Sequence, residues 1–119
     1  MNFAGGMSAV IDWEQLDMIA DGFTEEFVEI YHEFVGEIPG LFSTLQGNLD
    51  AADTTQAART AHQLKGSAAN FGFIGISEPM AALEHEAKGG SLANAPQHLA
   101  SAQAGFSSAV LEVKEQRGV

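Results

Sequence analysis

The stretch HQLKGSAANFG, residues 62–72, contains the residues of this chain that are best suited to chemistry. His62, Lys65 and Gly66 lie close together in a segment that otherwise has the composition of an alanine-rich helix. An exposed imidazole is largely unprotonated near neutral pH and can act as a nucleophile. A lysine one helical turn away would supply positive charge to a phosphoryl group attached to that imidazole. These residue types would suit a phosphoryl group carried on the histidine, and a surface histidine without a chemical role is the alternative.

The charge distribution around this segment also favours an anionic group. The chain has 16 acidic and 5 basic residues and a formal net charge of −11, yet residues 54–77 contain Arg59 and Lys65 and no acidic residue. Even spreading would place roughly three acids there. We interpret the gap as a local site kept free of negative charge so that an anionic group can approach. A chance gap in a stretch rich in serine and alanine is the alternative.

Length and composition limit the function classes. A chain of 119 residues fits a single domain, here 1–119, with residues 1–10 expected to be a flexible N-terminal segment. The absence of cysteine removes disulfides and thiolate metal sites and fits a reducing compartment, so we expect a cytoplasmic protein. The excess of acids disfavours binding to nucleic acid and to anionic membranes. Neither a signal peptide nor a membrane-length apolar run is apparent.

Hydrophobic periodicity is helical throughout and predicts five helices, at 12–20, 24–48, 54–71, 77–88 and 94–116. Each begins at a residue whose side chain can cap a helix: Asp12, Thr24, Asp53, Ser77 and Asn94. Pro39 is expected to kink or interrupt the second helix. Because the connections are short, we predict an all-α fold: an antiparallel up-down four-helix bundle with a short additional N-terminal helix.

The histidine lies on the outer face of the third predicted helix. Its core face consists of Ala57, Ala61, Leu64, Ala68 and Phe71. The surface neighbours of His62 are Ala58, Lys65, Gly66 and Ala69, and their small size would let another protein approach closely. Glycine inside a helix costs about 1 kcal/mol relative to alanine and so needs a reason. That reason is either the approach of a partner or the close packing of a neighbouring helix in the same bundle.

The segment TAHQLKGSAANFG resembles the H-x-L-K-G-S-A signature of histidine-containing phosphotransfer (Hpt) domains. The resemblance extends through IDWEQLDMI, EFVEIYHEFVGEIPGLFSTLQ, LDAADTTQAARTAHQLKGSA and MAALEHEAKGG. These segments cover nearly the whole chain up to Gly90, whereas the last predicted helix matches only in general character.

The resemblance implies that His62 accepts a phosphoryl group on Nε2 from a receiver-domain phosphoaspartate and passes it to another receiver. It implies that Lys65 supports the phosphoryl group electrostatically and that Gly66 leaves room for the receiver. The docking surface would also include Ala58, Arg59 and Ala69. The candidates for orienting the histidine are Gln63, Ser67, Glu84 and His85. Glu84 and His85 both lie on the following helix, and spacing does not choose between them.

The expected partners are response-regulator receiver domains and a hybrid sensor histidine kinase. By the resemblance, the receiver brings Mg²⁺ and the acidic pocket, so we expect no cofactor on this chain. The sequence contains no G-x-x-x-x-G-K-[ST] loop and no glycine-rich ATP lid, so we expect a monomeric phosphocarrier and not a kinase. Met18 and Val35 are further docking candidates on the first two helices.

Two other functions remain as alternatives. Four histidines and many glutamates could indicate a di-iron bundle, but only one E-x-x-H pair occurs, Glu29 with His32, and we expect no metal site. A helical-bundle adapter could dock receivers or other helices without chemistry. The joint presence of His62, Lys65 and Gly66 favours the carrier.

Overall fold

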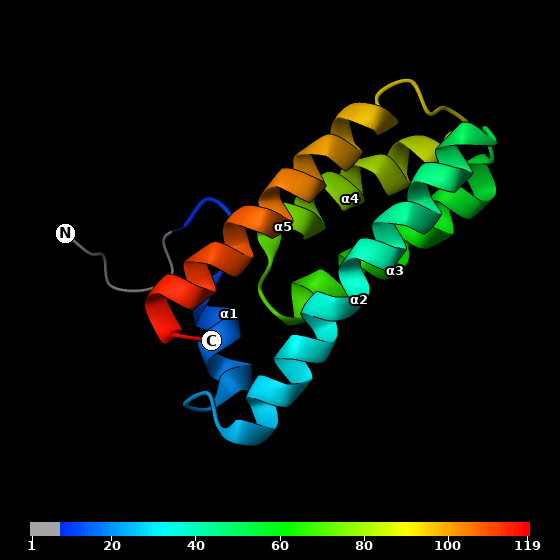
Figure 1. Cartoon of the computed structure of the whole chain (residues 1–119). Coiled ribbons are helices and arrows are strands. Elements are labelled where there is room, and N and C mark those ends of the chain that lie inside the picture. The colour runs from blue at the N-terminus through cyan, green and yellow to red at the C-terminus, as the bar shows by residue number, and fades with distance from the viewer. Residues whose placement is uncertain (1–7) are drawn as a thin grey trace.

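A computed structural model describes residues 8–119 as five α-helices with short connections (Figure 1). The helices are α1 (Trp13–Ala20), α2 (Glu25–Asp50), α3 (Thr54–Asn70), α4 (Ile74–Lys88) and α5 (Ala95–Arg117). No strand occurs in this part of the chain. The predicted all-α class is therefore confirmed, and the number of helices agrees with the periodicity.

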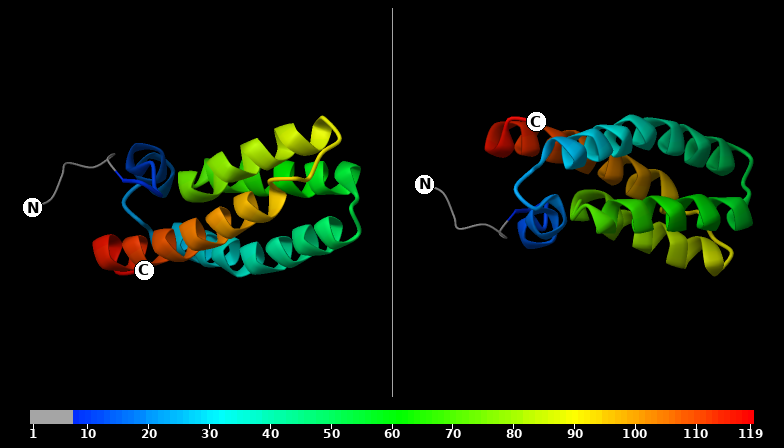
Figure 2. Two further views of the ribbon diagram at one scale, coloured as in Figure 1. Left: turned by 90° about the horizontal axis from the view of Figure 1, so that it is seen from above. Right: turned by 90° about the horizontal axis from the view of Figure 1, so that it is seen from below.

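The four longer helices pack lengthwise around one apolar core (Figures 1 and 2). Helix α3 packs against α2 and α4, α4 packs against α5, and α2 also contacts α5. The shorter α1 lies at one end of this bundle, beside the C-terminal end of α5 (Figure 2). Fully buried side chains from all five helices fill the core: Leu16, Ile38, Leu45, Leu64, Ile76, Met80, Leu83 and Val113.

Three helix starts follow from local chemistry as predicted. The side chains of Asp12 and Asp53 accept hydrogen bonds from the backbone N–H groups of Gln15 and Gln56, at 3.2 and 3.0 Å. Thr24 accepts one from Phe27 at 3.2 Å. Each bond satisfies a backbone donor that has no partner inside the helix. These caps fix where α1, α2 and α3 begin.

Two predicted caps are wrong. Helix α4 begins at Ile74, three residues before the expected start, and Ser77 lies inside it. Phe73 and Ile76 are fully buried, so the burial of this apolar segment decides where the helix starts. Asn94 does precede α5, but its side chain makes no cap bond. Its backbone N–H and side-chain amide donate to the carboxylate of Glu86 at 3.0 Å instead.

Helix α2 runs through Pro39 to Asp50, so of the kink or interruption predicted there the interruption does not occur. Proline removes one backbone donor and crowds the preceding turn. Pro39 is exposed, whereas Ile38 and Phe42 beside it are buried, so the proline ring faces away from the core. Burial of the apolar stripe on either side therefore holds the helix together across this position.

The chain just before α1 is held in place. Ser8 Oγ donates to Glu112 of α5 at 3.0 Å, and the backbone carbonyl of Val10 accepts from Gly75 of α4 at 3.1 Å. Residues 8–10 belong to the segment that was expected to be flexible, and these hydrogen bonds connect them to α4 and α5. Residues 1–7 of the same predicted segment lie outside the described residues.

Helices α4 and α5 cross at glycines. A Cβ atom added at Gly105 would overlap the backbone of Gly75, so only glycine allows the two helices to come this close. The crossing fixes the position of α4, the helix that packs against α3 and carries Glu84 beside His62.

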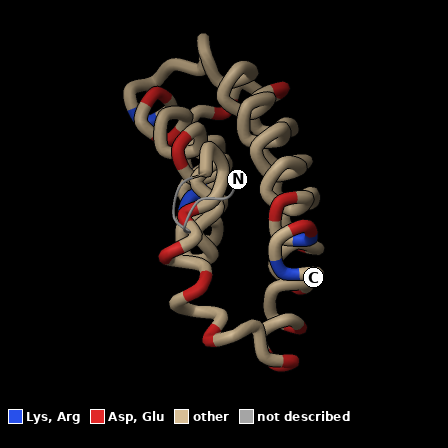
Figure 3. Tube along the Cα trace, turned by 90° about the vertical axis from the view of Figure 1, so that its left-hand side faces the viewer, with Lys and Arg blue, Asp and Glu red and all other residues tan. Residues whose placement is uncertain are grey.

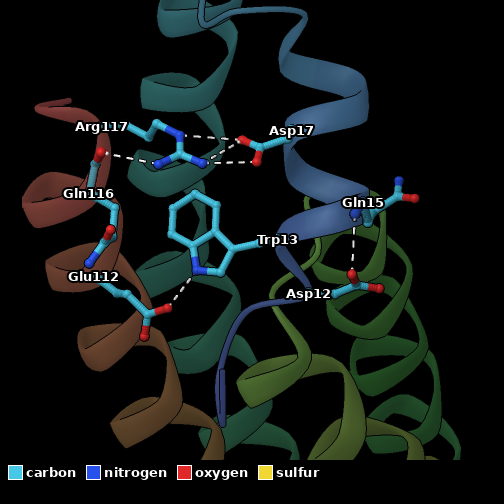
Figure 4. Close-up of polar contacts among 7 residues, drawn as sticks. All are labelled: Asp12, Trp13, Gln15, Asp17, Glu112, Gln116 and Arg117. Carbon is cyan, nitrogen blue, oxygen red and sulfur yellow. Dashed lines mark hydrogen bonds and ion pairs between the residues drawn. The ribbon is translucent and has the colours of Figure 1, made fainter. Parts of the chain in front are cut away.

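A polar clasp joins α1 to α5 (Figure 4). Trp13 Nε1 donates to Glu112 at 2.6 Å. The Arg117 guanidinium lies 4.4 Å from the centroid of the Trp13 ring and donates to Asp17, with Nη2 2.8 Å from Oδ2. A cation over an aromatic face and a paired carboxylate together orient the arginine. The clasp fixes α1 at the end of the bundle.

Acidic residues are distributed along the bundle, and basic residues are few (Figure 3). None of the helices within residues 8–119 has the length and apolar character needed to cross a membrane.

Candidate functional site

Helix α3 directs His62 into solvent. Its core face is buried at the five positions expected from the periodicity: Ala57, Ala61, Leu64, Ala68 and Phe71. The His62 side chain projects from the opposite side and is 66% exposed. The prediction of an outward-facing imidazole is therefore confirmed.

A glutamate on the neighbouring helix holds the His62 ring. Nδ1 of His62 lies 2.9 Å from Oε2 of Glu84, whose side chain is only 5% exposed. Sequence spacing left Glu84 and His85 as alternatives for this position. The structure places Glu84 against the imidazole, whereas His85 is exposed and makes no hydrogen bond to His62 within residues 8–119.

Glu84 is also paired with two lysines. Lys65 Nζ lies 2.7 Å from Oε1, and Lys88 Nζ lies 2.9 Å from Oε2. The hydrogen bond from Lys65, assisted by those from Lys88 and His62, lowers the pKa of Glu84 to about 2, although burial acts in the opposite direction. The Glu84 carboxylate is therefore ionised at neutral pH.

This arrangement leaves one imidazole nitrogen free to react. An ionised carboxylate can only accept hydrogen bonds, so Nδ1 carries the proton and donates a hydrogen bond to Glu84. The lone pair of a neutral imidazole is then on Nε2. No residue in the described part of the chain makes a hydrogen bond to Nε2 of His62. The site thus presents an oriented nucleophile on the surface.

Gly66 has no packing reason to be glycine. A Cβ atom added there would meet nothing within 4 Å, so the alternative of close packing by a neighbouring helix does not apply. Arg59 and Ala69 are exposed nearby on the same helix, as expected. Ala58 is buried, contrary to the prediction. It lies two turns before Lys65, on the side of α3 that packs against α4.

The remaining candidates lie further from the imidazole. Gln63 is exposed, and Ser67 is half-buried and borders a groove between α2 and α3. Neither makes a hydrogen bond to His62 in the region that the structure covers. Met18 is exposed on α1, whereas Val35 is half-buried and packs against the core.

Two residues near the site were missed from the sequence. Lys88 was not among the candidates, although its position four residues after Glu84 is the spacing of a helical ion pair. Ile30 is an exposed apolar residue on α2 that borders the same groove as Ser67. The sequence signal for Ile30 was an apolar residue directly before Tyr31, at the edge of the buried stripe of α2.

The single E-x-x-H pair does not form part of a metal site. His32 Nε2 lies 3.0 Å from the backbone carbonyl of Val119. Within residues 8–119, no group of three or more histidine, cysteine, aspartate or glutamate side chains has a geometry that could hold a metal ion.

Comparison with known proteins gives one family match and one structural match. The family model described as Hpt domain matches residues 29–116, a span that includes His62, Lys65 and Glu84. Among solved structures, the chain is similar to histidine-containing phosphotransfer protein B (HptB) from Pseudomonas aeruginosa PAO1. The two share 23% sequence identity with a TM-score of 0.85, over 94% of this chain and 97% of that chain, which shows a common fold. No curated protein sequence matched. Because the family model covers most of the sequence, the chain belongs to the Hpt domain family.

Proposed function

We propose that His62 is the phosphoacceptor of this Hpt domain, taking a phosphoryl group from a receiver-domain phosphoaspartate and passing it to a second receiver. Hpt domains are phosphotransfer carriers in phosphorelays and not kinases. The observation that carries the assignment is the hydrogen bond between Nδ1 of His62 and Glu84, together with the exposure of the ring. This hydrogen bond supports Nε2 as the reacting atom.

Every bond, proton and charge in the proposed transfer can be accounted for. Nε2 of His62 attacks the phosphorus, the bond between phosphorus and the aspartyl oxygen breaks, and the aspartate leaves as a carboxylate. The proton on Nδ1 stays in place, so the ring gains positive charge as the nitrogen–phosphorus bond forms. The ionised Glu84 beside Nδ1 stabilises that charge. Transfer to the second receiver is the reverse reaction.

Lys65 would provide positive charge for the phosphoryl group from one turn further along α3. The proposal assigns no cofactor to this chain, because the receiver is expected to bring Mg²⁺ and its acidic pocket. The receiver would dock on the exposed face formed by Arg59, Gly66 and Ala69. A hybrid sensor histidine kinase is the proposed source of the phosphoryl group.

Four finer features belong to the same proposal. The short connections support an antiparallel up-down order of α2 to α5. We take the chain to act as a monomer, in the cytoplasm and without an ATP-binding kinase core of its own.

An adapter that docks receivers without chemistry is the competing function, since the open face at Gly66 would serve it equally well.

A transfer assay separates the two functions. A receiver phosphorylated with labelled phosphate is mixed with the wild-type chain, with His62→Gln and with His32→Gln, a matched change of an exposed histidine on α2. We expect acid-labile, alkali-stable label on the wild type and on His32→Gln, and none on His62→Gln. Receiver binding without label on the wild type would identify an adapter. Label on His62→Gln would contradict the assignment of His62.

A further inference from the structure

The mechanism described above uses His62, Lys65 and Glu84 but gives no role to Lys88. Both oxygens of Glu84 are engaged: Lys65 is 2.7 Å from Oε1, while Oε2 is 2.9 Å from both Lys88 and His62. The carboxylate is almost completely buried, so water cannot replace a lost partner easily. The stability of the buried, ionised carboxylate therefore depends on how many donors remain bound to its oxygens.

In the proposed reaction the Lys65 ammonium has two competing partners, the Glu84 carboxylate and the phosphoryl group. In the unphosphorylated protein its ammonium is held by Oε1 of Glu84, on the buried side of the imidazole. A phosphoryl group on Nε2 would lie on the solvent side of the ring, because Nδ1 faces Glu84. Reaching that group takes the Lys65 ammonium away from the carboxylate. Glu84 would then lose one of its two cations while the ring gains charge.

We propose that Lys88 is a positioning residue that holds the Glu84 carboxylate against Nδ1 of His62 when Lys65 turns to the phosphoryl group. This inference rests on the proposed function of His62. Because Lys88 holds the carboxylate, Lys65 is free to bind the phosphoryl group. The hydrogen bond between Nδ1 of His62 and Glu84 then persists through the reaction. Lys88 acts through Glu84 and does not touch the phosphoryl group.

The surroundings of Lys88 fit this role. It lies four residues after Glu84 on α4, the spacing at which side chains meet on a helix. Lys65 and Lys88 border one surface hollow of about 280 Å³, together with Ala81, Glu84 and His85, so the ammonium groups have room to move. Without Lys65, the hydrogen bonds from Lys88 and His62 are the interactions that still lower the pKa of Glu84 against burial.

The test compares Lys88→Met, Lys88→Arg and Lys114→Met. Lys114 is an exposed lysine on α5, so its replacement removes the same charge from outside the site. Two quantities are measured on the full chain: the rate of phosphoryl uptake from a phosphorylated receiver, and the ¹⁵N and ¹H NMR signals of the His62 ring before and after phosphorylation. The second reports the proton on Nδ1 directly.

We expect Lys88→Met to slow uptake roughly tenfold, the size of effect expected for one lost charge-assisted hydrogen bond. Its ring signals should match the wild type before phosphorylation, because Lys65 still holds Glu84. After phosphorylation the Nδ1–H signal should exchange faster with water than in the wild type. Lys88→Arg should restore both properties, and Lys114→Met should behave as the wild type.

Two results would overturn the inference. One is wild-type uptake and an unchanged Nδ1–H signal in phosphorylated Lys88→Met. The other is an equal disturbance of the ring signals before and after phosphorylation that Lys88→Arg does not repair, which would mean a purely structural role. Failure of the proposed function is seen separately, as label on His62→Gln.

Discussion

Nδ1 of His62 and Oε2 of Glu84 lie 2.9 Å apart, although the two residues are 22 positions apart in the chain. The contact joins the exposed imidazole of α3 to a buried carboxylate of α4. It determines which ring nitrogen carries a proton and which is free to react. The chemistry of the site thus depends on the packing of α4 against α3.

Glu84→Gln should slow phosphoryl uptake. Glutamine keeps an oxygen that accepts from Nδ1–H, but it has no charge to balance the ring as the nitrogen–phosphorus bond forms. We expect a loss of roughly 10- to 100-fold, by analogy with the effect of removing the carboxylate partner of a metal-bound histidine. Uptake from a phosphorylated receiver measures it, with Glu78→Gln, an exposed site on α4, as the control. Equal rates for the two variants would exclude this role for Glu84.

The contribution of Glu84 to stability should depend on pH. Its carboxyl has a pKa of about 2 in the folded chain against an ordinary value of 4.5. The folded state therefore binds fewer protons in this range, and the stability that the ionised group contributes is present above about pH 4.5 and lost as the pH falls toward 2. Urea unfolding of wild type and Glu84→Gln should show their difference in unfolding free energy shrinking between these two values. A constant difference would contradict the shift.

Gly66→Ala should raise the stability of the fold and weaken the binding of a receiver domain. The added methyl group meets nothing within 4 Å, and alanine is favoured over glycine in a helix by about 0.5–1 kcal/mol. We expect that gain in unfolding free energy, with weaker binding to a receiver. Gly47→Ala in α2, where the space is also open, should give the gain without the loss. Equal receiver affinity for both variants would remove the docking role of Gly66.

Tyr31→Phe should stabilise the protein. The Tyr31 ring packs against Phe27, Phe34, Phe71 and Phe73, and its buried hydroxyl has no hydrogen-bond partner among residues 8–119. An unsatisfied buried hydroxyl costs about 1–3 kcal/mol, so its removal should raise the unfolding free energy by about 1 kcal/mol. Thermal and urea unfolding near neutral pH measure the change. A loss of stability would show that the hydroxyl has a partner.

The advantage of Tyr31→Phe should also grow at high pH. Burial raises the pKa of Tyr31 from 10.0 to about 12. The unfolded chain releases this proton first, so the wild type loses stability as the pH rises above about 10, whereas the phenylalanine variant does not lose it by this route. The difference between the two unfolding free energies at pH 8 and near pH 11 measures the effect.

Arg117→Met should loosen α1. The arginine packs over Trp13 and pairs with Asp17, and a cation over an aromatic ring with an exposed ion pair is worth about 1 kcal/mol. Trp13 is the only tryptophan in the chain, so its fluorescence reports the environment of α1. We expect a red-shifted emission and a small loss of stability, with neither change in Lys114→Met. Unchanged emission would show that α1 is held without the arginine.

Local chemistry decides the features of this protein that could be read from its sequence. The caps at Asp12, Thr24 and Asp53 are bonds between residues three positions apart, so their geometry does not depend on the rest of the fold. The outward direction of His62 follows in the same way from the periodicity of a single helix. The resemblance to the Hpt signature needs only the order of residues and agrees with the family match.

Contacts between helices decide the rest. Burial of Phe73 and Ile76 starts α4 three residues before the expected cap, because removing this apolar surface from water outweighs one capping bond. Glu84 and His85 differ by about 100° around their helix, so only the rotation of α4 against α3 determines which of them meets His62. Burial of Met80 and Leu83 fixes that rotation, and only the packed bundle determines that the Glu84 side of α4 then faces His62 of α3.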